Sequence, residues 1–244
     1  MTSKIGANVC LSAGTALGAR VTVGNNVTSY GVVEIGDDVV VFDGAVLGRP
    51  PMAAGNVTRA LGESGRPLQI GAGSIIGANA VLYTATTIGS RVLIGDLCSL
   101  REGCAIANDA VIGRGVLVMY ETSIGARTRV IDGAIITGLA TIEEDVFIGP
   151  GVNSINDNRI YLKRFGLVER TWRGPTIRRF AVIGAGAILS AEIEIGRGAL
   201  VAPSSMVTRD VPAWTIVAGV PARIQRPVDE EDRAKILAHF GVDD

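Results

Sequence analysis

Aromatic residues are scarce in this sequence. They make up 5% of its 244 residues, although 48% of the residues are hydrophobic and 32 are glycines. Large rings bury the most apolar surface per side chain, so a protein that lacks them has little to fill a thick core. We therefore expect a thin core built from aliphatic side chains.

Histidine and cysteine are almost missing. His239 is the single histidine, and the three cysteines, Cys10, Cys98 and Cys104, show no Cys-x-x-Cys spacing. An odd number of cysteines without that spacing indicates neither a disulfide framework nor a zinc knuckle. We expect reduced, buried thiols and no bound metal.

An excess of one charge sign and long apolar runs are also missing. The chain has 23 basic and 24 acidic side chains, a net charge of −1, which argues against nucleic acid as the main partner. No stretch approaches the ~18 apolar residues of a membrane-spanning helix, and the first residues do not have the pattern of a signal peptide. The sequence predicts a soluble, cytoplasmic protein that binds neither nucleic acid nor membrane.

Aliphatic residues recur with a period of six. Every sixth residue from Ile70 to Ile148 is Ile, Leu or Val, and the residue four places after each is small or β-branched. The same register runs from Ile5 to Leu47, with Ser29 as a polar exception, and from Ile177 to Val207. A period of six does not fit a helical face, but it fits short strands joined by turns. Three hexads make one triangular coil, and coils stacked about 4.8 Å apart share backbone hydrogen bonds.

The three corners of such a coil differ in sequence. A glycine follows the aliphatic residue at the first corner (as in Gly71) and at the second corner (as in Gly77), where we expect it to relieve backbone strain. The third corner lacks this glycine and has Tyr83, Arg101, Met119 and Thr137 in successive coils. Two segments that break the repeat, 49–69 and 154–176, both fall at the third corner. We expect function along this edge, with tolerated surface loops and packing side chains as the alternative.

The second break is basic. Residues 154–179 contain seven basic and two acidic side chains, a local charge of +5 in a chain of −1. Such a segment can attract phosphates, although a solvated basic surface is the alternative interpretation. The basic residues are Arg159, Lys163, Arg164, Arg170, Arg173, Arg178 and Arg179.

With this repeat over nearly its whole length, the sequence resembles the hexapeptide-repeat acyltransferases. The resemblance implies an all-β solenoid, a left-handed parallel β-helix of about ten triangular coils, in a homotrimer with sites between subunits. It implies a domain over 1–224 with loop insertions at 49–69 and 154–176. Residues 225–244 are expected to form a short helical tail that caps the end of the rod, and His239 in this tail is expected to be structural.

Two motifs extend the resemblance. The stretch IGPGVNSINDN, residues 148–158, is similar to the family segment in which an Asn-Asp pair contacts a nucleotide-linked amino sugar. This implies that Asn156 and Asp157 are catalytic, whereas an Asn-Asp pair alone is usually a turn. The remaining substrate-binding residues implied by this loop are Tyr161, Arg164, Trp172 and Arg173.

The second motif, DVPAWTIVAGVPARI at residues 210–224, resembles the family segment that lies beside bound acyl-CoA. It departs from the family pattern at Trp214 and Val220. The neighbouring coils are expected to offer backbone amides to the pantetheine arm and arginines to phosphate, with cap or surface charges as the alternative for the arginines. The implied cofactor-binding residues are Ala185, Ala202, Ser204, Arg209, Pro221 and Arg223.

The lack of a histidine in the coils distinguishes between reactions. Relatives that acylate a hydroxyl commonly use a coil histidine as general base, whereas an amine with a pKa near ~8 is partly neutral and attacks a thioester unaided. A single histidine also excludes the three-histidine zinc site of γ-type carbonic anhydrases. We expect Asp157, directly or through water, or the leaving thiolate to take the proton, and Asn156 to orient the amine or the oxyanion.

These observations predict an acyl-CoA-dependent N-acyltransferase that transfers an acetyl or other short acyl group to the amine of a nucleotide-linked amino sugar. Three alternatives remain open at this point. They are an O-acyltransferase, an N-acyltransferase acting on an amino acid, and a non-catalytic β-helix that serves as an assembly subunit.

Overall fold

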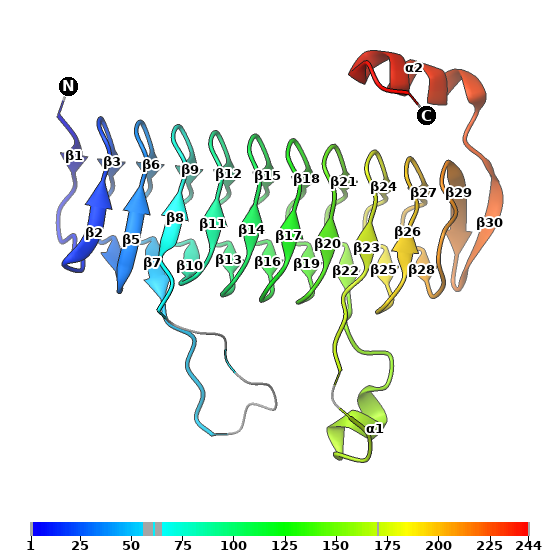
Figure 1. Cartoon of the computed structure of the whole chain (residues 1–244), viewed down its shortest axis with the longest axis horizontal. Helices are drawn as coiled ribbons and strands as arrows, with labels where there is room; N and C mark the ends of the chain where they lie inside the picture. Colours follow the sequence, from blue (N-terminus) through cyan, green and yellow to red (C-terminus); the bar gives the residue numbers. More distant parts are fainter. Residues whose placement is uncertain (1, 56–60, 62–64, 170, 244) are drawn as a thin grey trace.

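The chain folds into a long rod, a parallel β-solenoid (Figure 1). The computed structural model describes residues 2–55, 61, 65–169 and 171–243. Three sheets of 12, 9 and 9 strands run along the rod. The predicted solenoid is confirmed, and with eleven parallel strands in the longest sheet it has slightly more coils than the ten expected. The left hand of the coil stays a prediction of the family resemblance.

Along most of the rod each coil contributes one strand to each sheet, and the last strand of sheet 1 pairs antiparallel with its neighbour. Sheet 1 contains Lys4–Ile5 (β1), Thr22–Val23 (β3), Val40–Val41 (β6), Ile75–Ile76 (β9), Leu93–Ile94 (β12), Val111–Ile112 (β15), Arg129–Val130 (β18), Phe147–Ile148 (β21), Val182–Ile183 (β24), Leu200–Val201 (β27), Thr215–Gly219 (β29) and Ala222–Pro227 (β30). Sheet 2 contains Thr28–Ser29 (β4), Val46–Arg49 (β7), Val81–Tyr83 (β10), Ser99–Leu100 (β13), Leu117–Val118 (β16), Ile135–Ile136 (β19), Asn153–Ser154 (β22), Ile188–Leu189 (β25) and Met206–Val207 (β28). Sheet 3 contains Gly14–Leu17 (β2), Val32–Ile35 (β5), Leu68–Ile70 (β8), Thr87–Ile88 (β11), Ala105–Ile106 (β14), Ser123–Ile124 (β17), Thr141–Ile142 (β20), Thr176–Ile177 (β23) and Glu194–Ile195 (β26).

The core is a stack of aliphatic side chains from most strands, with a serine at the inward position of β4 (Ser29) and of β22 (Ser154). Ile88 pairs with Ile70 on one side and Ile106 on the other, so residues 18 apart stack directly. All three are at most 3% exposed. The polar exception, Ser29, is satisfied because its hydroxyl accepts a hydrogen bond from the Ser12 backbone amide at 2.8 Å. The thin aliphatic core predicted from composition is confirmed.

The glycines after the aliphatic residues have a different role from the one expected. Gly77 does not have a positive φ; that conformation falls two residues later, at Asn79 with φ 56°. A Cβ on Gly77 would lie 2.5 Å from the backbone nitrogen of Asp96 and 2.5 Å from the carbonyl carbon of Gly95. Gly77 is therefore required because the next coil approaches closely, and not because of backbone strain.

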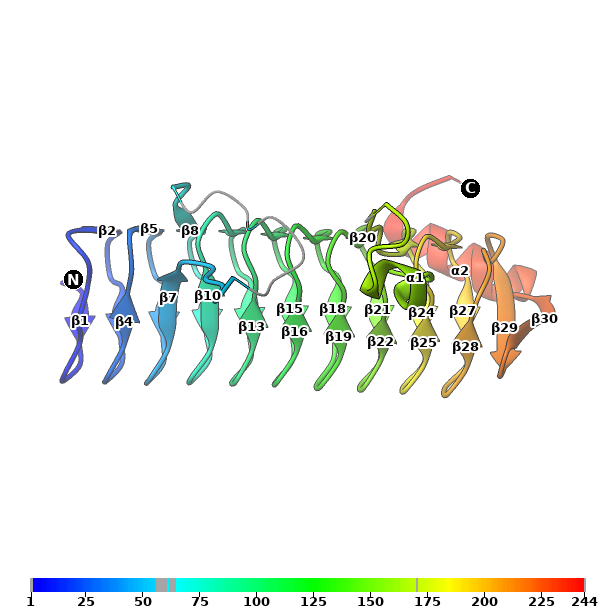
Figure 2. The ribbon, with the colours of Figure 1, turned by 90° about the horizontal axis from the view of Figure 1, so that it is seen from below.

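Both loops leave the rod at the third corner, which leads from sheet 2 to sheet 3. The first connects β7 with β8, and the second connects β22 with β23 and contains the helix Ile160–Arg164 (α1). They project on the same side of the rod (Figure 1) and are separated along its length (Figure 2). The predicted placement of both breaks at one corner is confirmed.

The C-terminal helix, Glu230–Phe240 (α2), lies along the flank of the rod rather than over its end (Figures 1 and 2). The Phe240 ring packs 4.8 Å from Phe180, and the Arg233 guanidinium lies 5.3 Å from the Trp214 ring. The expected cap on the end of the rod is therefore wrong, because these aromatic residues of the first corner provide the docking surface. The strand β30 continues to Pro227, beyond the expected boundary at 224.

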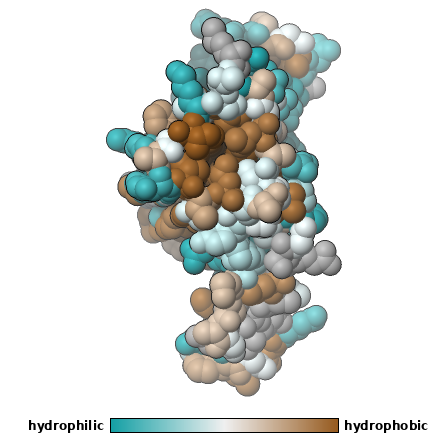
Figure 3. Space-filling view, turned by 90° about the vertical axis from the view of Figure 1, so that its left-hand side faces the viewer, coloured by the Kyte–Doolittle hydropathy of each residue, from teal (hydrophilic) through white to brown (hydrophobic). Residues whose placement is uncertain are grey.

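The N-terminal end of the rod exposes apolar side chains. At the N-terminal end β1, β2 and β4 are the outermost strands, apolar side chains gather there (Figure 3), and Ile5 is 49% exposed. Cys98 and Cys104 are buried as expected, whereas Cys10 is exposed. In the part of the chain that the structure describes, no helix is long and apolar enough to cross a membrane.

Candidate functional site

A column of residues follows the third corner between the two loops. Its members occupy the same place in five successive coils, since the underlying strands pair with an offset of 18 residues. The column starts beside the first loop and reaches the beginning of the second. It consists of Thr84, Glu102, Tyr120, Gly138 and Asn156.

Asn156 is held by two hydrogen bonds from its side-chain nitrogen. Nδ2 donates to the Tyr120 hydroxyl at 3.1 Å and to the Gly138 carbonyl at 3.3 Å. A backbone carbonyl only accepts, so the nitrogen end of the amide must point toward Gly138. With both N–H groups engaged, Oδ1 is the end that can bind a ligand. Asn156 can thus accept a hydrogen bond from an amine, but its side chain cannot donate one to an oxyanion.

Asp157 is part of a buried ion pair within the second loop. Its Oδ1 lies 3.0 Å from Lys163 Nζ and accepts a hydrogen bond from the Arg159 backbone amide at 2.8 Å. The side chains of Lys163 and Asp157 are only 7% and 11% exposed. Lys163 Nζ also donates to the Thr171 carbonyl, in the segment of the loop that leads back to the rod. We call the group Asp157, Lys163 and Thr171 the loop clasp.

Asn158 fixes the same loop to the rod. Its Nδ2 donates to the Ala191 carbonyl at 2.7 Å, and its Oδ1 accepts from the Ala191 amide at 3.1 Å. Ala191 lies at the third corner of a later coil, just after β25. The sequence analysis did not identify Asn158; its signal was a second asparagine directly after the Asn-Asp pair.

The expected substrate-binding residues share the loop but differ in environment. Tyr161 and Arg164 lie on α1 and are exposed, and Tyr161 packs edge-on against Phe165 with ring centroids 5.8 Å apart. Trp172 is half-buried. Arg173 is exposed and reaches Asn156 through the backbone, where its amide donates to the Asn156 carbonyl at 3.1 Å.

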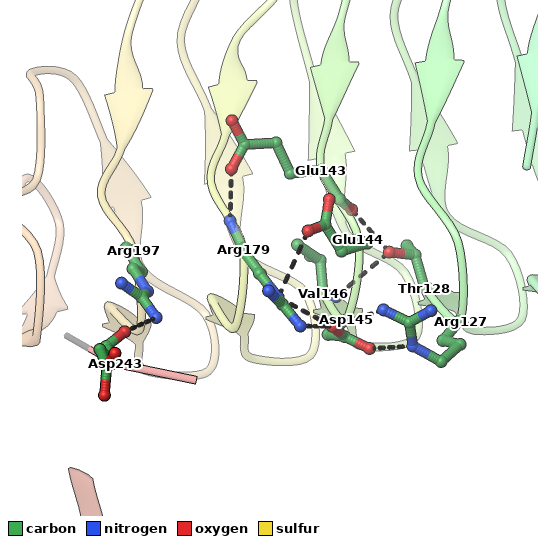
Figure 4. Close-up of polar contacts among 9 residues, drawn as sticks. All are labelled: Arg127, Thr128, Glu143, Glu144, Asp145, Val146, Arg179, Arg197 and Asp243. Atoms are coloured by element: carbon green, nitrogen blue, oxygen red, sulfur yellow. Dashed lines mark hydrogen bonds and ion pairs between the residues drawn. The ribbon is translucent and has the colours of Figure 1, made fainter. Parts of the chain in front are cut away.

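The local charge of +5 overstates the free positive charge of the segment. Lys163 is neutralised in the loop clasp, and Arg178 pairs with Glu143 at 2.8 Å and Glu194 at 2.6 Å. Arg179 lies 2.9 Å from Asp145, as Figure 4 shows. Arg178 and Arg179 belong to the first corner, away from the loop. Arg170 lies outside the described residues.

A second group of charges lies at the N-terminal end of the column. The Tyr83 ring has the Arg49 guanidinium 5.4 Å from its centroid and the Arg101 guanidinium 5.0 Å from it. Arg101 Nε donates at 2.8 Å to Glu102, which is 1% exposed. The sequence analysis noted Tyr83 and Arg101 but missed the buried Glu102, because in the sequence it resembles any surface glutamate.

Three of the expected cofactor-binding residues lie at the second corner, which leads from sheet 1 to sheet 2. The Ala202 amide donates to the Val217 carbonyl at 2.9 Å, and the Ser204 amide donates to the Ala185 carbonyl at 2.8 Å. These two amides stabilise the stacking of coils and are not available to a pantetheine arm. The expected offer of amides is therefore wrong for Ala202 and Ser204.

Arg209 and Arg223 come together at the C-terminal end of the rod. They line one cavity of about 410 Å³, whose apolar wall includes Val211, Val217 and Ile224. Pro221 lies in the turn between β29 and β30 and follows a cis peptide bond. Ala185, Ala202 and Ser204 do not line this cavity, so the structure separates the expected cofactor-binding residues into two groups. Within the described part of the chain, no group of three or more histidine, cysteine, aspartate or glutamate residues is arranged to hold a metal ion.

Sequence similarity to curated relatives is confined to part of their length. The chain is 43% identical over 75 residues to a 2,3,4,5-tetrahydropyridine-2,6-dicarboxylate N-acetyltransferase of Clostridium perfringens, covering 30% of this chain and 32% of that protein. It is 44% identical over 69 residues to the serine acetyltransferase of Escherichia coli, covering 28% of this chain and 25% of that protein. The matches thus span about a third or less of these relatives. No family model matches the chain.

Among solved structures, a hexapeptide-repeat acetyltransferase of Vibrio cholerae complexed with acetyl-coenzyme A is 24% identical. The match has a TM-score of 0.47 and covers 52% of this chain and 72% of that one. The six-residue repeat extends along the whole rod, and the two sequence relatives that match segments of the chain are acetyltransferases. Over about 30% of its length, the chain is thus similar to acetyltransferases.

Proposed function

We propose that this protein is an acyl-CoA-dependent N-acyltransferase that acts on the amine of a nucleotide-linked amino sugar. The observation that carries the proposal is the direction of the Asn156 amide, whose donors are both engaged and whose Oδ1 is left as an acceptor. An amine has N–H groups to donate to this oxygen. The names of the sequence relatives support acetyl transfer, and one of them is an N-acetyltransferase.

The proposed reaction needs no histidine. A neutral amine, held by Asn156 Oδ1, attacks the thioester carbonyl; the C–N bond forms, the C–S bond breaks, and the amine proton passes to the departing thiolate to give the free thiol. Asp157 is held in an ion pair with Lys163, so we assign its charge to the shape of the loop. The thiolate is then the proton acceptor, which was one of the two expected from the sequence.

The acyl-CoA is proposed to bind along the last coils. Its support is the resemblance of residues 210–224 to the acyl-CoA segment of the family, together with the cavity lined by Arg209 and Arg223. Two arginines that line a cavity with a partly apolar wall suit a phosphorylated ligand with an aliphatic arm, although Asp210 also lines it. Pro221 lies in the adjacent turn.

A homotrimer is proposed from the outer faces of the sheets. Sheet 1 exposes apolar residues, among them Leu93 at 40% and Phe147 at 39%, and sheet 2 exposes Leu117 at 38% and Ile188 at 41%. The outward positions of sheet 3 are mostly polar, among them Gln69, Thr87, Ser123, Thr141 and Glu194. Contiguous apolar faces favour burial against another chain. Packing through sheets 1 and 2 would bring the second corner, with Ala185, Ala202 and Ser204, against a neighbouring subunit.

The phosphates of the acceptor are proposed to meet the exposed arginines of the third corner. Arg49 beside Tyr83 and Arg164 and Arg173 on the second loop are exposed cations along one edge of the rod. Guanidinium groups bind phosphate oxygens in a bidentate manner. These residues therefore favour an acceptor that carries phosphate over a neutral amino sugar.

The proposal is tested by mass analysis of products formed with acetyl-CoA from a panel of acceptors. The panel pairs nucleotide-linked amino sugars with their hydroxyl analogues. It also includes other amino acids and the two acceptors that the names of the relatives give, serine and 2,3,4,5-tetrahydropyridine-2,6-dicarboxylate. We expect one N-acetylated nucleotide sugar and unreacted hydroxyl analogues. Products from amino acids or from hydroxyl sugars alone would contradict the proposed acceptor. Absence of any thermal stabilisation by millimolar coenzyme A would instead favour a non-catalytic assembly subunit.

A further inference from the structure

Tyr120 has no role in the reaction as described so far, although it contacts the residue that is central to it. We infer that Tyr120 is a positioning residue, which anchors the Asn156 amide in the orientation set by the Gly138 carbonyl, with Oδ1 toward the acceptor amine. The inference deepens the proposed function and rests on it. Tyr120 acts through Asn156 and is not itself a catalytic residue.

The geometry that carries the inference spans three successive coils at the third corner. Tyr120, Gly138 and Asn156 are spaced by 18 residues and stack along the rod. The Asn156 side chain reaches back over Gly138 to the Tyr120 hydroxyl, 3.1 Å from Nδ2. Two coil spacings amount to about 9.6 Å, so only a long side chain such as tyrosine can meet Asn156 from this position.

Gly138 makes this contact possible. A Cβ at this position would lie 2.7 to 2.9 Å from three atoms of the Tyr120 ring. Its φ is not positive, so backbone conformation does not require glycine. The missing side chain leaves room for the ring to lie along the corner and bring its hydroxyl under Asn156.

The Asn156 carboxamide has two similar orientations, and its side chain must be held in one of them. A rotation by 180° exchanges Oδ1 and Nδ2, which are nearly equal in size. The Gly138 carbonyl, at 3.3 Å, accepts from Nδ2 only and disfavours the rotated form. A phenolic hydroxyl can donate as well as accept, so Tyr120 does not itself distinguish the two orientations. It supplies a second, shorter bond, which holds the side chain in the orientation that the Gly138 carbonyl selects. Without this bond the Asn156 side chain is held by one contact only and presents Oδ1 to the acceptor amine in a smaller part of its population.

The first test is kinetic. Tyr120→Phe keeps the ring and removes the hydroxyl, and we expect kcat/KM for the acceptor to fall about 3- to 10-fold, the range for one hydrogen bond, with KM for acyl-CoA unchanged. A double-mutant cycle with Asn156→Ala separates positioning from direct catalysis. If Tyr120 acts through Asn156, Tyr120→Phe has no further effect in the Asn156→Ala background. An equal loss in both backgrounds would overturn the inference, and so would wild-type kinetics for Tyr120→Phe.

A second variant guards against a change in folding. Gly138→Ala should displace the ring and lower kcat/KM for the acceptor as Tyr120→Phe does. Adding Tyr120→Ala to Gly138→Ala should relieve the clash and restore the thermal midpoint but not the kinetics. Recovery of both together would mean that Tyr120 serves packing alone, and the inference would be wrong.

A crystal structure of Tyr120→Phe gives a readout that does not depend on activity. We expect the Asn156 side chain to move or to adopt two conformations, with the rest of the third corner unchanged. An unmoved, single conformation would overturn the positioning role. If the wild-type protein acylates none of the panel, the proposed function fails, and this structural comparison still decides whether Tyr120 fixes Asn156.

Discussion

Replacing Lys163 by methionine tests whether Asp157 shapes the loop or acts as a base. The Lys163–Asp157 pair, at 3.0 Å, is about nine-tenths buried on both sides, and removing one partner of a buried pair costs about 3 to 5 kcal/mol. Lys163 also donates to the Thr171 carbonyl, so Lys163→Met removes both contacts of the clasp. We take about 3 kcal/mol, the lower end of this range, as the free energy by which the clasp favours the closed loop. That corresponds to about a hundredfold change in the ratio of closed to open loop.

The assay is amide hydrogen exchange, which reports local opening. In Lys163→Met and in Asp157→Asn, amides over 159–168 should exchange about a hundredfold faster, whereas the amides of β16 and β19 should exchange as in the wild type. Arg164→Met, on the same helix but exposed, is the matched control and should leave exchange unchanged. The clasp is refuted if exchange in the loop is the same in Lys163→Met as in the wild type. If Asp157→Asn abolishes transfer while loop exchange stays slow, Asp157 is the base.

Three further predictions concern the rod. Burial by itself would raise the pKa of the Asp145 carboxyl, but hydrogen bonds from Arg127 and Arg179 outweigh burial and hold the pKa below its ordinary range. The ionised carboxylate therefore stabilises the fold at neutral pH, and this contribution is lost as pH falls below about 4. In urea unfolding, the free energy of unfolding of Asp145→Asn should fall less between pH 7 and pH 3 than that of the wild type. Gly77→Ala should lower unfolding free energy by about 1 to 3 kcal/mol because its Cβ meets the next coil, whereas Gly115→Asn, at an open position with φ 63°, should be nearly neutral by thermal melting. Arg223→Gln should reduce the thermal shift produced by coenzyme A if its cavity binds the phosphates, and an unchanged shift would place the cofactor elsewhere.

The predictions that succeeded depend on local repetition. A hexad specifies its own short strand and turn, and identical hexads stack without reference to distant sequence. The period, the thin core and the placement of both loops at the third corner could all be predicted from the sequence. Residues 18 apart in the sequence, such as Ile70 and Ile88, are neighbours in the stack of coils. The role of the corner glycines could not be predicted from the sequence. Whether Gly77 relieves strain or avoids the next coil depends on the distance between coils, which the sequence does not contain.

The candidate site could be predicted only in part, because its contacts also depend on distances that the sequence does not contain. The Asn-Asp pair was identified, but its chemistry depends on partners that are far away in the chain. Tyr120 is 36 residues before Asn156, and Lys163 reaches Asp157 only because the loop forms α1 and returns. The tail was misplaced because the aromatic surface that binds α2 combines Phe180 and Trp214 from different coils.

The sequence alone thus determined the architecture of this protein. The scarcity of aromatics, the excess of glycine and the six-residue period together specify a thin triangular rod, and the position of the breaks specifies the edge from which both loops project. Only the tertiary structure decided which atoms are available on that edge. In the structure both N–H groups of Asn156 are hydrogen-bonded, and Asp157 is paired with Lys163. Arg178 and Arg179 are neutralised by ion pairs at another corner. The physical reason is that a hydrogen bond or an ion pair is a property of two groups and their distance, and a repeat pattern describes only one group at a time.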